Sequence, residues 1–414
     1  MHKRNLLRFV FTVFAAATTV SLYTQPSMIH LGLGSGLKKG KSAPVTVTWT
    51  SENSSGTQNV VFGQKPEPSK TVKARETSYS GGAVYSAELD RLKPGKKYYY
   101  KCGSDAAGWS RVYSFSTEPR KGSFTVAVIG DTQDNANNEN FVRSEAVINA
   151  VRQHRPSLTL HMGDVVNDGS MTTSWETFLN VSQDLNSESP SMPVLGNHDV
   201  NNNKGDDFQK PFDDFYDLFS LPGDEVNYSF TYGKVRFIGI FSGYAQGAEP
   251  LGLVKYKPGS PEYDWLDDEL SKAENVRGIN WIIVWMHYPV NSFGWSNIKG
   301  WKENILPLIE KHRVDLCLAG HRHVYERHLQ MKNGVAAKKH SEKELSANDG
   351  TLFITNGTAG GNPTGPGGRE IPTIAFTPDR TMYSFAIMDI DRGAITYRVF
   401  DVDNNLIDHF VLER

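Results

Sequence analysis

The sequence contains few cysteines, no excess of either charge and few long apolar runs. Its only two cysteines, Cys102 and Cys317, speak against a disulfide framework and suggest small buried side chains instead. Lys plus Arg is 44 and Asp plus Glu is 46, a formal balance of −2. This balance gives no electrostatic basis for binding a nucleic-acid scaffold. The 414 residues, 38% apolar and 22% charged, fit a globular protein of two to three domains.

One apolar run lies near the N-terminus. Lys3, Arg4 and Arg8 stand ahead of, or at the start of, a run from Phe9 to Leu22. A basic start followed by a short apolar stretch is typical of a secretory signal, and the run is short for a membrane-spanning helix. We predict that residues 1–24 are a signal peptide or an uncleaved N-terminal anchor. The protein would then be secreted, periplasmic or on the cell surface.

Residues 25–119 have the pattern of an all-β domain. Val45 to Trp49, Lys97 to Lys101 and Val112 to Thr117 alternate with a period of two, and Gly-containing turns separate such runs. Several short strands without a helical period predict a β-sandwich. The stretch from Leu89 to Tyr98 resembles the strand–turn–strand corner of fibronectin type III modules. No titratable cluster occurs here, so we assign this domain no chemistry.

Residues 120–414 alternate between strands and helices, which predicts an α/β domain. Charged residues fill Lys332 to Asn348, which we predict to be a loop. The main predicted strands are Phe124 to Ile129, Leu158 to Met162, Met192 to Leu195, Val235 to Phe241, Trp281 to Met286 and Val314 to Ala319, and the main predicted helices are Asn140 to His154, Ser174 to Leu185, Pro261 to Lys272 and Trp301 to His312.

Five of these strands are followed by residue types that commonly bind metals in proteins. They are followed by Asp131, Asp164, Asn197 with His198 and Asp199, His287, and the pair His321 and His323. A glycine precedes four of the five groups, which lets the backbone turn sharply. His321 and His323 stand two residues apart, so in an extended chain they point to one side. Ligands bind at the carboxyl ends of strands in open α/β sheets, which predicts one shared site.

The chemistry of this set suits two metal ions. Asp131, Asp164 and His323 can hold one ion, and Asn197, His287 and His321 can hold the other. Asp164 can bridge them, because a carboxylate has two oxygens to share. Two such cations form a clamp for displacement at phosphorus and lower the pKa of a shared water. His198 would then bind the phosphate or protonate the leaving group, and Asp199 could orient His198.

At these residues the chain resembles the calcineurin-like metallophosphoesterase superfamily, and its two-domain layout is similar to that of the purple acid phosphatases. The resemblance implies a four-layer α-β-β-α core of two sheets flanked by helices. It also implies an acid phosphatase-like hydrolase of phosphate esters that uses two metal ions and a bridging hydroxide. The motifs that carry it are Gly130-Asp131-Thr132-Gln133, Gly163-Asp164-Val165-Val166-Asn167, Gly196-Asn197-His198-Asp199, Trp285-Met286-His287 and Gly320-His321-Arg322-His323.

Two positions and one segment depart from the family pattern. Purple acid phosphatases have an iron-binding Tyr where this chain has Asn167, which predicts a colourless enzyme with divalent Fe, Mn or Zn and leaves Asn167 as a candidate further ligand. Many metallophosphoesterases have His at the position of Gln133, which is either a weak ligand or a hydrogen-bond partner of the ligands. The substrate-contacting histidines of plant members are missing from Tyr288 to Trp301. That segment has Asn291, Trp295 and Lys299 instead, so substrate preference does not carry over.

Alternatives stay open at this point. The same centre could serve a phosphodiesterase, or the chain could be a non-catalytic surface-binding protein. A protein Ser/Thr phosphatase is disfavoured, because Asn167-Asp168-Gly169 stands where those enzymes have Asp-Arg-Gly. We further expect an ion pair between Glu326 and Arg327 and a packed core histidine at His161. The glycine-rich stretch from Gly357 to Gly368 is either a phosphate cradle or a tight loop.

Overall fold

The computed structural model describes most of the chain after its first 24 residues. The N-terminal signal or anchor prediction therefore lies outside the described residues. None of the helices in the described part is long and apolar enough to span a membrane. The described ranges are 25–34, 40–52, 56–134, 140–200, 213–242, 256–292, 301–336, 343–365 and 372–414.

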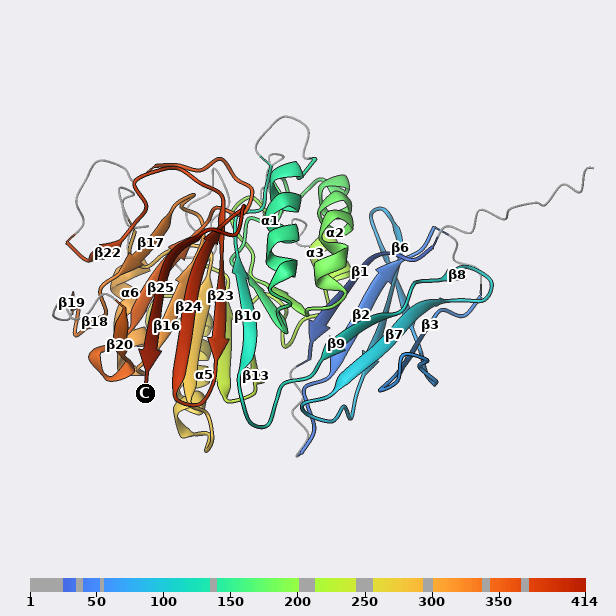
Figure 1. Ribbon diagram of the computed structural model, residues 1–414, viewed down its shortest axis with the longest axis horizontal. Coiled ribbons are helices and arrows are strands. Elements are labelled where there is room, and N and C mark those ends of the chain that lie inside the picture. The colour runs from blue at the N-terminus through green and yellow to red at the C-terminus, as the bar shows by residue number, and fades with distance from the viewer. Residues whose placement is uncertain are drawn as a thin grey trace, which may run out of the picture.

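The N-terminal part is a sandwich of two antiparallel sheets (Figure 1). One sheet has the order β1-β2-β6-β5, and the other has the order β4-β3-β7-β8 with β9 also paired to β7. Alternating side chains of both sheets fill the space between them, which confirms the predicted all-β domain. The strands are β1 (Ser27–Leu33), β2 (Val45–Thr50), β3 (Asn59–Gly63), β4 (Lys70–Lys73), β5 (Arg75–Tyr79), β6 (Gly82–Leu89), β7 (Lys97–Ser104), β8 (Gly108–Trp109) and β9 (Tyr113–Ser116).

The larger part contains two seven-stranded mixed sheets. The first has the order β12-β11-β10-β23-β24-β25-β20, and the second has the order β13-β14-β15-β16-β21-β17-β22. The first comprises β10 (Phe124–Ile129), β11 (Leu158–His161), β12 (Ser191–Pro193), β20 (Glu344–Ser346), β23 (Ser384–Ile390), β24 (Ala394–Asp401) and β25 (Leu406–Glu413). The second comprises β13 (Tyr228–Tyr232), β14 (Val235–Ile240), β15 (Trp281–Met286), β16 (Leu316–Ala319), β17 (Tyr325–His328), β21 (Leu352–Asn356) and β22 (Ile374–Phe376).

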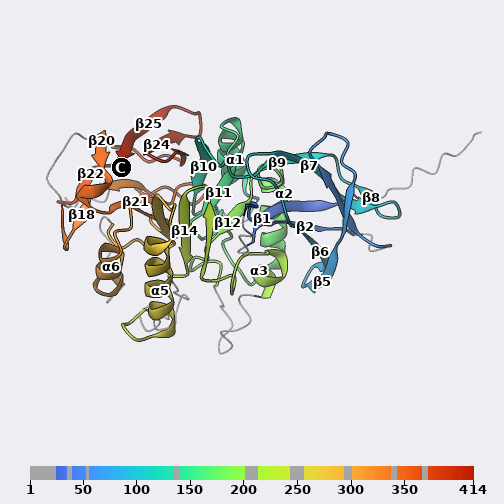
Figure 2. The ribbon, with the colours of Figure 1, turned by 90° about the horizontal axis from the view of Figure 1, so that it is seen from below.

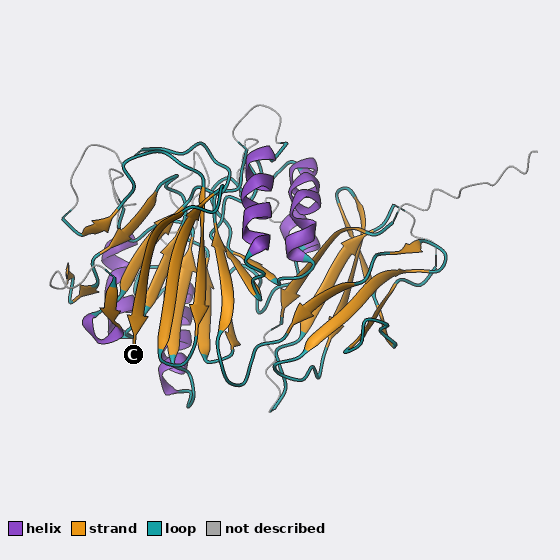
Figure 3. Ribbon diagram, in the orientation of Figure 1, coloured by secondary structure: helices purple, strands orange, loops and turns teal. Residues whose placement is uncertain are grey.

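Helices cover the outer sides of the two sheets (Figures 2 and 3). Helices α5 (Pro261–Asn275) and α6 (Trp301–Lys311) pack on the second sheet, where their apolar residues share a core with β14, β15 and β16. Helices α1 (Val142–Gln153) and α2 (Thr172–Asn186) lie beside β10 and its neighbours, and α3 (Asp213–Leu218) lies near α2. The predicted four-layer α-β-β-α core is confirmed.

The sandwich and the α/β body share one hydrophobic core, which runs from β1 through α2 into the first sheet. Side chains and main chain are joined across the contact. The Ile29 N–H donates to Oε1 of Gln183 at 3.0 Å, and Nε2 of His30 lies 2.9 Å from the Leu218 carbonyl oxygen. The Tyr100 hydroxyl donates to the Ser187 carbonyl oxygen at 2.8 Å. The domain boundary at residues 119 and 120 stays a prediction.

Several local expectations are settled by the packing. Cys102 and Cys317 are free and buried, as predicted. The expected pair between Glu326 and Arg327 is wrong, because neighbours on a strand face opposite sides. Arg327 instead donates to Asp408 from Nε at 2.7 Å, joining β17 of the second sheet to β25 of the first. Glu326 accepts from the Ser292 hydroxyl at 2.8 Å.

The segment from Lys332 to Asn348 is not only a loop. It includes β20, which pairs in parallel with β25 at the edge of the first sheet, and a 3₁₀ turn at Ala347–Asp349. A three-residue edge strand needs no apolar alternation, so its charged sequence gave no strand pattern.

A buried ion pair also joins the sheets and predicts a pH-dependent loss of stability. Nη2 of Arg414 lies 2.7 Å from Oδ2 of Asp315, which is almost fully buried at the start of β16. Burial raises the pKa of Asp315 to about 6, although Arg414 favours its charged form. Stability therefore falls as the pH rises through about 6, where Asp315 ionises inside the fold and comes to depend on Arg414.

We expect Arg414→Ala to lower the free energy of unfolding by about 2 kcal/mol near neutral pH, since it leaves Asp315 unpaired. The figure is below that of a fully buried pair, because Arg414 is 38% exposed. Urea unfolding should show a smaller loss at about pH 5, where Asp315 is protonated in the folded protein. The exposed Arg392→Ala serves as the control. An equal loss at both pH values would contradict this role of the pair.

Candidate metal centre

The strand ends of both sheets converge on one site. Strands β10, β11 and β12 run parallel in the first sheet, as do β14, β15, β16 and β21 in the second. Their carboxyl ends therefore meet at one edge. Three of the residues that follow these strands, Asp131 (φ 58°), Asp164 (φ 50°) and His321 (φ 64°), have left-handed backbone conformations. Such strain outside glycine costs on the order of 1–3 kcal/mol and clusters at functional sites.

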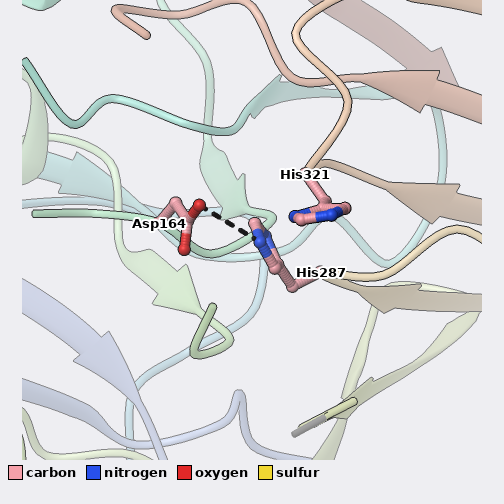
Figure 4. Close-up of side chains that lie close together, drawn as sticks. All are labelled: Asp164, His287 and His321. Carbon is pink, nitrogen blue, oxygen red and sulfur yellow. Dashed lines mark ion pairs between the residues drawn. The ribbon is translucent and has the colours of Figure 1, made fainter. Parts of the chain in front are cut away.

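Asp164 points toward His287, and His321 lies on the far side of His287 (Figure 4). Oδ2 of Asp164 is 3.2 Å from Nε2 of His287, and ligand atoms of Asp164, His287 and His321 lie within 4.8 Å of one another. Oδ1 of Asn197 lies 3.0 Å from Nε2 of His287 and 3.1 Å from Nδ1 of His321. The structure thus brings four of the predicted ligands into contact.

These contacts gather electron-pair donors that repel one another without a positive charge between them. Nδ1 of His287 lies 2.9 Å from the Met162 carbonyl oxygen, to which it donates, so Nε2 faces the oxygens of Asp164 and Asn197. Burial opposes a charge on His287, but Asp164 raises the pKa of its imidazole to about 9. At neutral pH a proton on Nε2 of His287 therefore stands where a metal cation would also be stabilised. This set of donors fits a metal ion.

The neighbouring charges and burial shift the pKa values of Asp164 and His321 in the direction that favours metal binding. Burial alone would raise the pKa of Asp164, but His287, His198 and His321 hold it well below its usual range. Burial and the nearby His287 lower the pKa of His321 well below its usual value. An ionised carboxylate next to a neutral imidazole is the protonation state in which both bind metal.

Asp131 and His323 form a second group of predicted donors. Nε2 of His323 is 3.4 Å from Oδ1 of Asp131, while Nδ1 of His323 lies 2.8 Å from the Asn362 carbonyl oxygen. Asp131 is fully buried, and its Oδ1 accepts no hydrogen bond, a costly arrangement that a bound cation would relieve. The amide nitrogen of Gln133 lies 3.0 Å from Oδ2 of Asp164 and 3.3 Å from Nε2 of His323. Gln133 thus takes the geometry of a hydrogen-bond partner.

Glycines make this packing feasible. A Cβ on Gly357 would lie 2.5 Å from Oδ2 of Asp131, and one on Gly361 would lie 2.5 Å from Cε1 of His323. The Gly361 N–H donates to the Asp131 carbonyl oxygen at 2.8 Å. The glycine-rich loop is therefore packed directly against two of the predicted ligands. Its described part matches the tight-loop alternative rather than a phosphate cradle.

His198 lies beside the cluster, but Asp199 does not orient it as expected. Nδ1 of His198 donates to the Asn167 carbonyl oxygen at 2.8 Å, and its main-chain N–H donates to Oδ1 of Asp164. The Asp199 carboxylate accepts from the main-chain N–H groups of Val166 and Gly196 instead. Burial and the nearby Asp164 raise the pKa of Asp199 to about 7. Asp199 therefore ties two strand ends together.

Some contacts of the site could not be found from sequence. The main-chain oxygens of Met162, Asn167 and Asn362 orient three histidines, and any residue type has such an oxygen. The Tyr288 ring lies 4.2 Å from the His321 ring, centre to centre. His161 is buried against Thr132 and Phe178, which confirms its prediction as a core histidine. The side chain of Asn167 makes no hydrogen bond to the predicted ligands within the described part of the chain.

Comparison with known families defines the class of protein. Residues 124–325 match the family described as Calcineurin-like phosphoesterase, and residues 26–117 match the family described as Purple acid Phosphatase, N-terminal domain. The chain therefore carries a calcineurin-like phosphoesterase domain behind a purple acid phosphatase N-terminal domain. It is a phosphoric ester hydrolase by these matches, and the resemblance drawn from the motifs is confirmed.

Individual proteins agree with this class. Purple acid phosphatase 21 of Arabidopsis thaliana is 25% identical over 350 residues, which cover 82% of this chain and 72% of that protein. Acid phosphatase type 7 of Homo sapiens is 26% identical over 367 residues, or 81% and 78% of the two chains. The solved structure of purple acid phosphatase PPD1 from yellow lupin seeds shares the fold, with a TM-score of 0.78 at 19% identity over 94% of this chain and 75% of that one.

The family implies divalent metal ions, and the donor set described above fits them. The number and identity of the ions, and the assignment of each ligand and catalytic residue, remain predictions.

Proposed function

We propose that this protein hydrolyses phosphate monoesters at a dinuclear metal centre. Asp131, Asp164 and His323 would hold one ion, and Asp164, Asn197, His287 and His321 the other. The observation that carries the proposal is the convergence of buried oxygen and nitrogen donors around Asp164, from the ends of strands in both sheets. Such a set is costly in a fold unless it binds cations.

When bound, the two cations would supply a bridging hydroxide near neutral pH and neutralise charge on the phosphoryl oxygens. Residues of the chain would orient the groups around the site and supply a proton. The Asn167 carbonyl oxygen accepts from Nδ1 of His198, which would leave Nε2 of His198 to face a bound substrate. A protonated His198 could give its Nε2 proton to the leaving alkoxide. Asp199 would hold the two strand ends that carry Asp164 and His198.

The metal content tests this proposal directly. We expect about two divalent ions per chain in protein purified without added metal, measured by elemental analysis. We also expect no visible absorption band, since Asn167 offers an amide where a coloured iron(III) site would need a tyrosinate. A chain with no bound metal would contradict the proposal. A strong visible band would contradict only the expectation drawn from Asn167 and would indicate an iron(III) site.

The kind of ester is tested separately. With added Mn²⁺ or Zn²⁺, p-nitrophenyl phosphate should turn over faster than bis(p-nitrophenyl) phosphate. The reverse order would identify a phosphodiesterase with the same centre. We also propose export of the protein, on the basic and apolar pattern of residues 1–24. We expect N-terminal sequencing of the protein from a secreting host to show cleavage near residue 24. A mature chain that starts at Met1 would contradict a cleaved signal peptide and favour the uncleaved anchor.

A further inference from the structure

One arginine outside the proposed ligand set is linked to His323 through a single intermediate residue. The Asn362 carbonyl oxygen can only accept, so Nδ1 of His323 carries a hydrogen and Nε2 is the ring nitrogen that faces Asp131. The orientation of Asn362 therefore sets both the tautomer and the direction of the His323 ring.

Asn362 is held in turn by Arg143. Nη1 of Arg143 donates to Oδ1 of Asn362 at 2.5 Å, a charge-assisted hydrogen bond. Arg143 lies in the first turn of α1, and its guanidinium carbon lies 5.8 Å from the centre of the Tyr383 ring. The next residue, Ser144, donates to the Thr132 carbonyl oxygen at 2.5 Å, so this turn is tied to the segment that carries Asp131.

Main-chain hydrogen bonds hold the loop on both sides of Asn362. Ala359 and Gly361 donate main-chain hydrogen bonds to Gly130 and Asp131, and Thr364 donates to the His323 carbonyl oxygen. Within the described part of this loop, the Asn362 amide is the side chain that reaches α1. The Arg143–Asn362 hydrogen bond thus adds a side-chain link from α1 to the residue that lies between these main-chain contacts.

We propose that Arg143 is a positioning residue of the metal centre: through Asn362 it fixes the His323 ring and strengthens metal binding on the side formed by Asp131 and His323. The proposal rests on the proposed function. Arg143 touches no predicted ligand, so its effect passes through Asn362. Groups that orient a metal-bound histidine are typically worth about 10- to 100-fold in metal affinity.

The sign of the effect separates this role from simple electrostatics. Arg143 is positive, so removing it would strengthen cation binding if charge alone mattered. Loss of orientation instead weakens binding. We expect Arg143→Ala to weaken binding of one Mn²⁺ by about 10-fold or more, and to leave the ion held by Asn197, His287 and His321 nearly unchanged.

The experiment is calorimetric titration of Mn²⁺ into the full chain after removal of metal by a chelator. Variants are Arg143→Ala, Arg143→Lys, Asn362→Ala and the Arg143→Ala/Asn362→Ala double variant. Arg152→Ala removes the same charge from the other end of α1, where it pairs with Asp184, and serves as the matched control. Since Arg143 and Asn362 act in series, the double variant should lose no more affinity than either single variant.

Unchanged or tighter Mn²⁺ binding in Arg143→Ala, or additive losses in the double variant, would overturn the role of Arg143. Arg143→Lys keeps the charge and should lie between wild type and Arg143→Ala; it provides the comparison if the alanine variant does not fold. A wild-type chain that binds no Mn²⁺ or other divalent metal would overturn the proposed function and this proposal together. A wild-type chain that binds two ions, beside an unaffected Arg143→Ala, would overturn this proposal alone.

Discussion

Replacing Asp164 by Asn is expected to lower kcat/KM for p-nitrophenyl phosphate by roughly 10³-fold or more. Asp164 contacts His287 and Gln133 through Oδ2 and accepts from the His198 N–H through Oδ1. An amide keeps the shape but removes the negative charge and one acceptor. Both metal ions would lose their shared ligand, so metal content should fall together with activity.

The control for this substitution is Asp184→Asn on α2. Asp184 is 44% exposed and pairs at the surface with Arg111 and Arg152, so its loss should change stability by about 1 kcal/mol or less and leave activity intact. Circular dichroism would verify that both variants fold. An Asp164→Asn protein with full activity would contradict a hydrolytic centre at this site. An unchanged biological effect from an inactive variant would favour the surface-binding alternative.

The candidate site could be predicted from the sequence because its signals are local. An apolar run, a glycine and then Asp131 or Asp164 can be recognised without knowing which strands pair. The parallel arrangement then brings the ends of β10, β11, β15 and β16 to one edge. The alternation in Val45 to Trp49 predicted the sandwich in the same way, since β2 covers Val45–Thr50.

The features that sequence reasoning missed depend on long-range contacts. Strand β25 (Leu406–Glu413) has an alternating pattern that was overlooked, and β20 forms only because β25 offers it an edge. Orientation of His287 and His323 by the oxygens of Met162 and Asn362 leaves no trace in residue type. Asp199 was misassigned for a related reason: adjacency to His198 suggested a contact that the backbone directs elsewhere.

The predicted ligands come from loops with strained backbone, and the surrounding packing can offset that strain. Asp131, Asp164 and His321 occupy left-handed conformations that cost free energy, and each is bound on both sides by main-chain hydrogen bonds or packed glycines. The fused hydrophobic core of sandwich and α/β body provides stability that can offset this strain.

Replacing His198 by Ala is expected to lower kcat by about 10²- to 10⁴-fold while the metal content stays at the wild-type level. His198 contributes no predicted metal ligand, and its ring is fixed by the Asn167 carbonyl oxygen. If its Nε2 proton is given to the leaving alkoxide, the loss should depend on the leaving group. Alkyl phosphates, whose alkoxides are poor leaving groups, should lose more activity than p-nitrophenyl phosphate, whose leaving group needs little protonation.

The leaving-group series separates proton donation from phosphate binding by His198. A residue that only binds phosphate would raise KM or lower kcat by a similar factor for every ester, because all of them share the phosphoryl group. His154→Gln is the matched control, since His154 caps the far end of α1 and contacts Asn404. A uniform loss across the series would assign His198 to phosphate binding. Loss of metal from the His198→Ala protein would instead show that the ring, through its hydrogen bond to the Asn167 carbonyl oxygen, holds the segment whose main-chain N–H donates to Asp164.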